Sequence, residues 1–204
     1  VLSDPAAHVM EAYGSAYHIN SSFFPIIELL EKRLLLIEQD DSPQKKLIKL
    51  ENFLLKLDLD FKENMPLLAE FLSIPSEQFP PPIISPFAKK QRLLESLIMF
   101  FLAQANEKPL FFLMEDMHWC DASTKEWMNL FLEQLPTHPI FILCTTRPGF
   151  RPDWIGRSEV TQITLQRLSE EDMAQISNHL TGGRALPEEI LDQISDKTEG
   201  VPLF

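Results

Sequence analysis

Apolar residues recur at helical spacing through the first half of the chain. Such residues form one stripe along an α-helix, so each set predicts an amphipathic helix packed on a core. Ser42 and Pro43 favour a helix N-terminus just before the second set. Two sets share the spacing i, i+3, i+7 and i+10: Ile27, Leu30, Leu34 and Ile37, then Leu47, Leu50, Leu54 and Leu57.

Two further helices are predicted on either side of a proline-rich connection. A short helix covers 63–73, and a long one covers 87–107. Between them, five prolines lie within 75–86 and exclude regular structure, because proline lacks an amide donor and fixes φ. The long helix carries one apolar face: Leu94, Leu97, Ile98, Phe101 and Ala105.

The second half of the chain changes to continuous apolar runs of strand length. Residues 110–114 and 140–146 are such runs, and the helical pattern between them places Trp127, Leu130, Phe131 and Leu135 on one face. This order predicts a parallel βαβ unit whose strands are buried on both faces.

A weaker strand and two helices are predicted to follow. The strand covers 160–165. One helix begins near Ser169, with Asp172 three positions on, and the other opens at Pro187. Gly200 stands where a helix usually ends.

Composition narrows the class of protein. The 204 residues include 30 acidic and 18 basic side chains, giving a net charge of -12, which disfavours nonspecific binding to nucleic acid. Cys120 and Cys144 form no disulfide framework, so we expect packing roles and a reducing, cytoplasmic setting. No apolar run approaches the roughly 20 residues of a membrane span.

Two adjacent carboxylates follow the first apolar run. Because ligands bind beyond the carboxyl ends of parallel strands, Glu115 and Asp116 are candidates for a Mg²⁺-nucleotide site. One carboxylate would hold the metal's water shell, and the other would orient or deprotonate an attacking water. The alternative is a strand that ends in a polar loop, with Asp121 or Ser123 capping the next helix; Ser123 and Glu126 fit a capping box.

The second apolar run ends in two hydroxyls and a cation. Thr145, Thr146 and Arg147 would lie at the same edge of the sheet as the two carboxylates. An arginine there can stabilise charge that develops in phosphoryl transfer, and a threonine can hold water or a phosphate oxygen. The alternative is an ordinary turn, since Pro148 and Gly149 follow.

These residues carry a resemblance to a known family. "PLFFLMEDMHWCDAST" resembles the Walker B segment of the signal-transduction ATPases with numerous domains (STAND), most closely the AAA-like modules beside bacterial adenylate or guanylate cyclase domains. "FILCTTRP" resembles their sensor-1 strand, and "TEGVPLF" resembles their Gly-x-Pro motif. "GSAYHINSSFFPIIELLEK" is similar to the segment after their second strand, so the resemblance covers nearly the whole chain.

The resemblance implies a role for each matching residue. Glu115 would act on Mg²⁺, Asp116 would polarise the hydrolytic water, and Arg147 would sense the γ-phosphate of ATP. Gly200 and Pro202 would face the adenine or ribose from a helical lid. The wider class has Asp before Glu, whereas Glu comes first here, so the assignment of the two carboxylates stays open.

The resemblance also implies an α/β fold: part of a P-loop NTPase (AAA/STAND-like) parallel sheet flanked by helices. Residues 1–167 would be a partial nucleotide-binding core, with a helical insertion at about 20–107 and the Walker B to sensor-1 region at 108–167. Residues 168–204 would begin the lid. No Gly-x-x-x-x-Gly-Lys motif occurs, so we expect the phosphate loop upstream of Val1, with the family's second core strand at 7–14. The phosphate-loop strand would lie between 140–146 and 160–165.

The expected function is a regulatory module that binds and hydrolyses ATP within a larger signalling protein. Its partners would be ATP or ADP and other domains of the parent chain, such as a cyclase or other output domain and helical repeats, and the intact protein could form an oligomer. The alternative is a degenerate, non-hydrolysing interaction module of the same fold. An origin-type ATPase is disfavoured by the charge. A zinc site at His118, Cys120 and Asp121 lacks a second ligand cluster.

Overall fold

The chain divides into two compact units, each described by itself. The computed structural model describes residues 6–184, 186–198, 200 and 201. The first unit spans residues 1–160 and the second spans 161–204. The boundary expected after residue 167 therefore falls inside the second unit.

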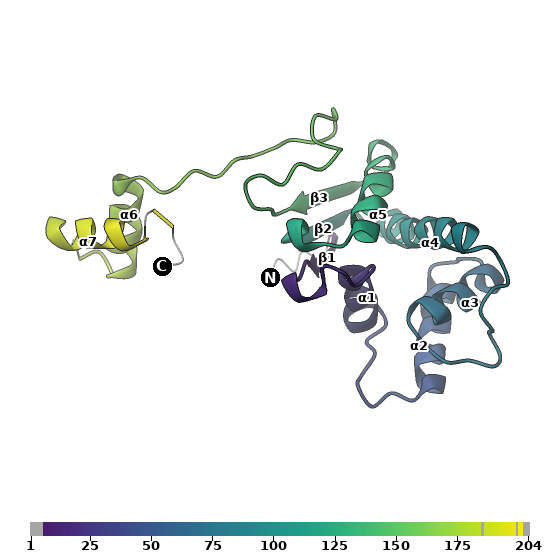
Figure 1. Cartoon of the computed structure of the whole chain (residues 1–204). Coiled ribbons are helices and arrows are strands. Elements are labelled where there is room, and N and C mark those ends of the chain that lie inside the picture. Colours follow the sequence, from purple (N-terminus) through teal and green to yellow (C-terminus); the bar gives the residue numbers. More distant parts are fainter. Residues whose placement is uncertain (1–5, 185, 199, 202–204) are drawn as a thin grey trace. The chain divides into compact units, whose positions relative to one another are not determined.

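The first unit is built on a small parallel sheet (Figure 1). Its strands are β1 (His8–Tyr13), β2 (Leu110–Glu115) and β3 (Ile140–Cys144), in the spatial order β1-β2-β3. Both strand pairs are parallel. The prediction of a parallel βαβ unit is therefore confirmed, and the fold is mixed α/β with helices flanking the sheet. The predicted burial of the strands on both faces is wrong, because β3 alternates half-buried and exposed residues and Phe141 is 61% exposed.

One face of the sheet forms the centre of the core. Leu110, Phe112 and Met114 alternate along β2 as buried residues. The ring of Phe112 lies 5.0 Å from that of Phe101 and 6.0 Å from that of Trp127, centroid to centroid. Aromatic side chains from the helices on either side of β2 in the sequence thus bury this face of the central strand.

The first helical stripe packs on the core as predicted, but the helix is shorter. After the 3₁₀ turn η1 (Ala16–His18), α1 (Phe24–Leu29) continues into a short π-helix, η2 (Leu30–Leu34). Leu30 is buried and Ile37 is partly buried against the core. Leu36 takes a left-handed φ of 51°, which ends the helix before Ile37.

The next two helices match the sequence pattern closely. The second stripe lies on α2 (Pro43–Lys56) and its C-cap, with all four leucines buried. Ser42 caps α2, because its hydroxyl accepts a hydrogen bond from the Lys45 amide at 3.3 Å. Helix α3 (Phe61–Phe71) begins two residues earlier than expected, with Asp60 accepting from the first-turn amides.

The long helix and the helix between β2 and β3 complete the first unit. Helix α4 (Pro86–Glu107) follows a stretch, 75–85, without helix or strand, as predicted. Helix α5 (Ala122–Leu132) is capped by Asp121, which accepts from the amides of Ser123 and Thr124. The Ser123–Glu126 capping box is therefore wrong. The 3₁₀ turn η4 (Leu135–Thr137) leads to β3.

The second unit contains the two predicted helices but not the predicted strand. Ser169 and Asp172 form the expected capping box at α6 (Glu170–Leu180), and α7 (Glu188–Thr198) follows. Residues 160–165 form no strand, because no strand among the described residues pairs with them. Val160 packs at the edge of the core of the first unit, whereas Ile163 and Leu165 are exposed. None of the helices that the structure describes is long and apolar enough to cross a bilayer.

Candidate functional site

The chain turns sharply where β2 ends. Asp116 takes the left-handed conformation, with φ 52° and ψ 41°, which aspartate tolerates better than most residues. A 3₁₀ turn, η3 (Met117–Trp119), follows directly. The backbone of β2 thus leaves the sheet immediately after Glu115, at the predicted edge.

Thr145 fixes this turn from the neighbouring strand. Its hydroxyl oxygen accepts a hydrogen bond from the Asp116 amide at 3.0 Å, and its carbonyl accepts from the Met117 amide at 3.0 Å. The Thr145 amide in turn donates to the Met114 carbonyl. Thr145, predicted to hold water or phosphate, therefore has a structural task as well, since it joins the end of β3 to the loop of the carboxylates.

Gly14 approaches the same turn from β1. Its amide donates to the Glu115 carbonyl at 2.8 Å, and a Cβ at this position would lie 2.3 Å from the Asp116 carbonyl oxygen. Only glycine leaves room for that approach. Sequence reasoning missed this residue, although a glycine directly after a strand is the kind of signal that marks a close backbone approach.

The two carboxylates have different surroundings. Glu115 is the register partner of Tyr13, so its side chain lies on the same sheet face as the Tyr13 ring. The Asp116 side chain is 47% exposed, and its Oδ1 lies 3.9 Å from Nδ1 of His118. Among the described residues, neither carboxylate is paired with a lysine or an arginine. Both are therefore available to a cation.

Arg147 reaches across the strand ends to an aromatic ring. Its guanidinium carbon lies 4.9 Å from the centroid of the Trp119 ring, and the His118 ring lies 4.6 Å from the same ring. The Thr146 hydroxyl donates to the Arg147 carbonyl at 3.0 Å. Trp119 is thus the contact of Arg147, the predicted phosphate sensor.

The structure gives the cysteines packing roles, as expected. Cys120 and Cys144 are free, and burial raises the pKa of the Cys120 thiol to about 12 and that of Cys144 to about 11. Cys120 Sγ lies 3.9 Å from Met114 Sδ, and Asp121 is occupied by the N-terminus of α5. Cys120 and Asp121 would each have to give up these contacts to bind a zinc ion together with His118.

The structure brings five of the predicted site residues to one edge. Glu115 and Asp116 follow β2, while Thr145, Thr146 and Arg147 follow the adjacent β3. Gly200 belongs to the second unit, where its carbonyl accepts a hydrogen bond from the Leu168 amide at 2.9 Å. Pro202 lies outside the described residues.

The face of the sheet opposite the core is apolar and open. Val9, Phe111 and Phe141 form one row in register, and the rings of Phe111 and Phe141 stack at 5.5 Å. Phe141 is 61% exposed and Leu143 is 43% exposed. On its outer edge, β3 has no partner strand among the described residues. Parallel sheets are normally covered on both faces, so the exposure of these apolar side chains is unusual.

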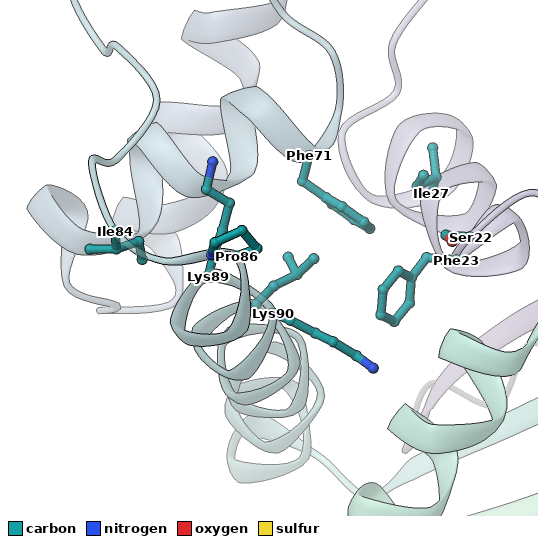
Figure 2. A pocket seen from close by; sticks show the side chains of 9 residues that line it. Ser22, Phe23, Ile27, Phe71, Ile84, Pro86, Lys89 and Lys90 are labelled. Atoms are coloured by element: carbon teal, nitrogen blue, oxygen red, sulfur yellow. The ribbon is translucent and has the colours of Figure 1, made fainter.

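A separate pocket lies in the helical region (Figure 2). It encloses about 470 Å³ near the start of α4, and Figure 2 shows the rings of Phe23 and Phe71 turned toward it. Its two cationic residues are already paired: Lys89 with Glu70 at 2.8 Å and Lys90 with Glu126 at 2.5 Å. These ion pairs tie α4 to α3 and α5, which accounts for both lysines without a ligand.

Three acidic residues before α2 also lie close together. Oxygens of Glu38, Asp40 and Asp41 are within 4.8 Å of one another. The buried Asp41 carboxylate forms ion pairs with Lys45 at 2.5 Å and with Lys49 at 2.6 Å, and these contacts hold its pKa well below the usual range. The two ammonium groups balance two of the three negative charges of this cluster, and their ion pairs with Asp41 anchor α2.

Comparisons with known proteins give a distant match. A segment of 121 residues, 58% of this chain, is 25% identical to the uncharacterized protein R02095 of Rhizobium meliloti (strain 1021). The match covers 12% of that relative, which is therefore much longer. No family model matches the chain. No solved structure matches it.

Proposed function

We propose that this chain is part of a regulatory ATP-binding and ATP-hydrolysing module of the STAND class of P-loop ATPases. The observation that carries the proposal is the convergence of Glu115 and Asp116 with Thr145, Thr146 and Arg147 at the ends of adjacent parallel strands. Ligands of open parallel sheets bind at this edge. The coarse fold is compatible with the proposal, and the family identity rests on the motifs.

The unpaired edge of β3 supports the same proposal. The family's phosphate-loop strand would lie next to β3, on the side away from β2, and the order β1-β2-β3 leaves that position free. A helix following the same loop would cover the open face that carries Phe111 and Phe141. One βα unit would thus supply both the phosphate loop and the missing cover.

The carboxylates fit a magnesium-nucleotide complex in chemistry and exposure. Carboxylate oxygens are the hard ligands that Mg²⁺ takes, and among the described residues neither Glu115 nor Asp116 forms an ion pair with a lysine or an arginine. Bound Mg²⁺ would supply charge neutralisation at the phosphates. In this assignment Glu115 would hold the water shell of the ion, and Asp116 would accept the proton of the attacking water.

Arg147 and the two threonines would act on the phosphate side. A guanidinium donates paired hydrogen bonds to phosphate oxygens, which suits Arg147 as a sensor of the third phosphate. Thr145 holds the turn of Asp116 through its hydroxyl oxygen and keeps its own hydroxyl proton to donate. The hydrogen-bonded turn would thus fix the position of Asp116, the proposed base, relative to Arg147, the proposed phosphate sensor.

The length of the matched relative agrees with a module inside a larger protein. The chain spans 12% of that relative, so the activity and partners of any whole parent protein are part of the proposal. We propose nucleotide-dependent signalling to other domains of the parent chain, such as a cyclase or another output domain.

Asp116→Asn in the full-length protein tests the proposal. The amide cannot accept a proton, so Mg-ATP binding should persist while turnover falls by about 10²- to 10⁴-fold. Calorimetric titration and phosphate release measure the two effects, with Asp153→Asn as a control of equal charge change outside the strand ends. A wild-type protein that binds Mg-ATP without turnover, or that does not bind it, would reject the hydrolysing module and favour the degenerate interaction module.

A further inference from the structure

Arg147 is held by an aromatic face on one side of the strand ends. Its guanidinium carbon is 4.9 Å from the Trp119 ring centroid, and the side chain is otherwise exposed. Among the residues that the structure describes, no carboxylate forms an ion pair with Arg147. The ring of Trp119 is therefore the contact that fixes where this cation stands.

The contact turns Arg147 toward β2. Trp119 belongs to the turn that follows β2, and β2 is the strand paired with β3. The free edge of β3 lies on the opposite side, and under the function proposed above the phosphate loop would lie there. Arg147 thus points away from the side on which the third phosphate of ATP would arrive.

We propose that Trp119 is a positioning residue that holds Arg147 back until ATP draws it away. The inference rests on the proposed function, and it adds a device that sets the preference for ATP over ADP. ADP lacks the third phosphate, so it would leave Arg147 on the ring. An exposed cation–π contact is weak, whereas an arginine–phosphate contact is a charge-assisted, bidentate hydrogen bond. Arg147 would therefore leave the Trp119 ring and bind the third phosphate when ATP is present.

Removing the ring should therefore tighten ATP binding selectively. Trp119→Leu in the full-length protein is expected to strengthen Mg-ATP binding by about 2- to 5-fold, the range of an exposed cation–π contact, and to leave Mg-ADP unchanged. Trp119→Phe keeps an aromatic face and should stay close to wild type. Phe150→Leu is the matched control, because it removes another cation–π contact, with Lys125 at 5.4 Å.

A double-mutant cycle and fluorescence separate this role from plain packing. In an Arg147→Ala background, which itself should weaken ATP and spare ADP, Trp119→Leu should change neither affinity. A non-hydrolysable ATP analogue should shift the tryptophan emission of the wild-type protein, and neither ADP nor the Trp119→Phe variant should give that shift.

Two results would overturn the inference in distinguishable ways. Wild-type protein that binds ATP, with Trp119→Leu weakening ATP and ADP equally or altering neither, would leave the proposed function standing and reject the positioning role. Wild-type protein that binds no Mg-ATP would reject the function and the positioning role together. The Phe variant keeps the test valid if the Leu variant fails to fold.

Discussion

The carbonyl oxygen of Asp116 lies where a side chain of Gly14 would stand. A Cβ on Gly14 would be 2.3 Å from that oxygen, closer than real Cβ atoms come to any neighbour. Because the obstacle is backbone, a side-chain rotation cannot relieve it. The first strand therefore supports the turn that carries the predicted base, over a distance of about a hundred residues in sequence.

We accordingly expect Gly14→Ala to displace the Asp116 turn. Forcing a methyl group into this contact should cost about 1–3 kcal/mol of stability, the range of overpacked sites. Turnover should fall as well, because the turn positions Asp116. Thermal unfolding and ATP hydrolysis by the full-length protein measure the two effects.

Gly156→Ala is the control for this substitution. Gly156 has a φ of 96° and open space around its Cβ position, so alanine there is strained without touching the site. It should lose some stability and keep its turnover per folded molecule. Full activity in Gly14→Ala would show that the turn tolerates the methyl group.

Substitution of Glu115 and of Asp116 should have different effects, because the proposed roles of the two carboxylates differ. Glu115→Gln is expected to raise the magnesium concentration needed for half-maximal ATP binding by about 10- to 100-fold, as losses at the outer shell of metals do. Glu11→Gln on the same sheet face is the control, since Glu11 already accepts a hydrogen bond from Tyr13 at 2.9 Å. If Asp116→Asn gives the shift in magnesium dependence instead, the two roles are exchanged.

The sequence predicted the elements that periodicity and turn chemistry determine. The stripe of Leu47 to Leu57, the cap at Ser42 and the box at Ser169 and Asp172 are local signals, and the structure has all of them. The strand predicted at 160–165 was wrong, because a segment of alternating apolar residues forms a strand only when it pairs with another strand.

The site was predictable only in part for the same physical reason. That Glu115 and Arg147 share an edge follows from parallel strands, since carboxyl ends of such strands meet. The contact of Arg147 with Trp119 and the approach of Gly14 to Asp116 depend on how a turn folds over neighbouring strands. No spacing along the chain contains that information.

The buried Asp41 should make stability depend on pH. Its pKa is lowered in the folded state, so the stabilisation is present above the ordinary pKa near 4 and is lost as the pH falls below that value. Asp41→Asn should therefore lower the melting temperature at pH 7, with the difference from wild type shrinking in acid. Asp40→Asn, at an exposed carboxylate next in sequence, should have little effect at either pH.

The aromatic cluster around β2 should be the most sensitive part of the core. Phe112 is fully buried against Phe101 and Trp127, so Phe112→Ala should cost about 3–5 kcal/mol in chemical denaturation. Phe87, which is 73% exposed at the start of α4, is the control, and its replacement by alanine should change stability by about 0.5 kcal/mol or less. Similar losses at both positions would mean that Phe112 is not central to the core.

If the proposed function holds, residues 1–204 produced by themselves should bind no Mg-ATP and show little cooperative stability. The outer edge of β3 has no partner strand among the described residues, and Phe141 and Leu143 stand exposed on the open face beside it. An unpaired edge next to exposed apolar side chains invites association between copies. Under the proposed function the phosphate loop lies outside residues 1–204, so these residues alone would lack the amides that hold phosphates. Calorimetric titration with Mg-ATP and thermal unfolding test both expectations, with the full-length protein as the control. Micromolar binding together with a sharp transition would show instead that these residues form a complete domain and that the position assigned to the phosphate-loop strand is wrong.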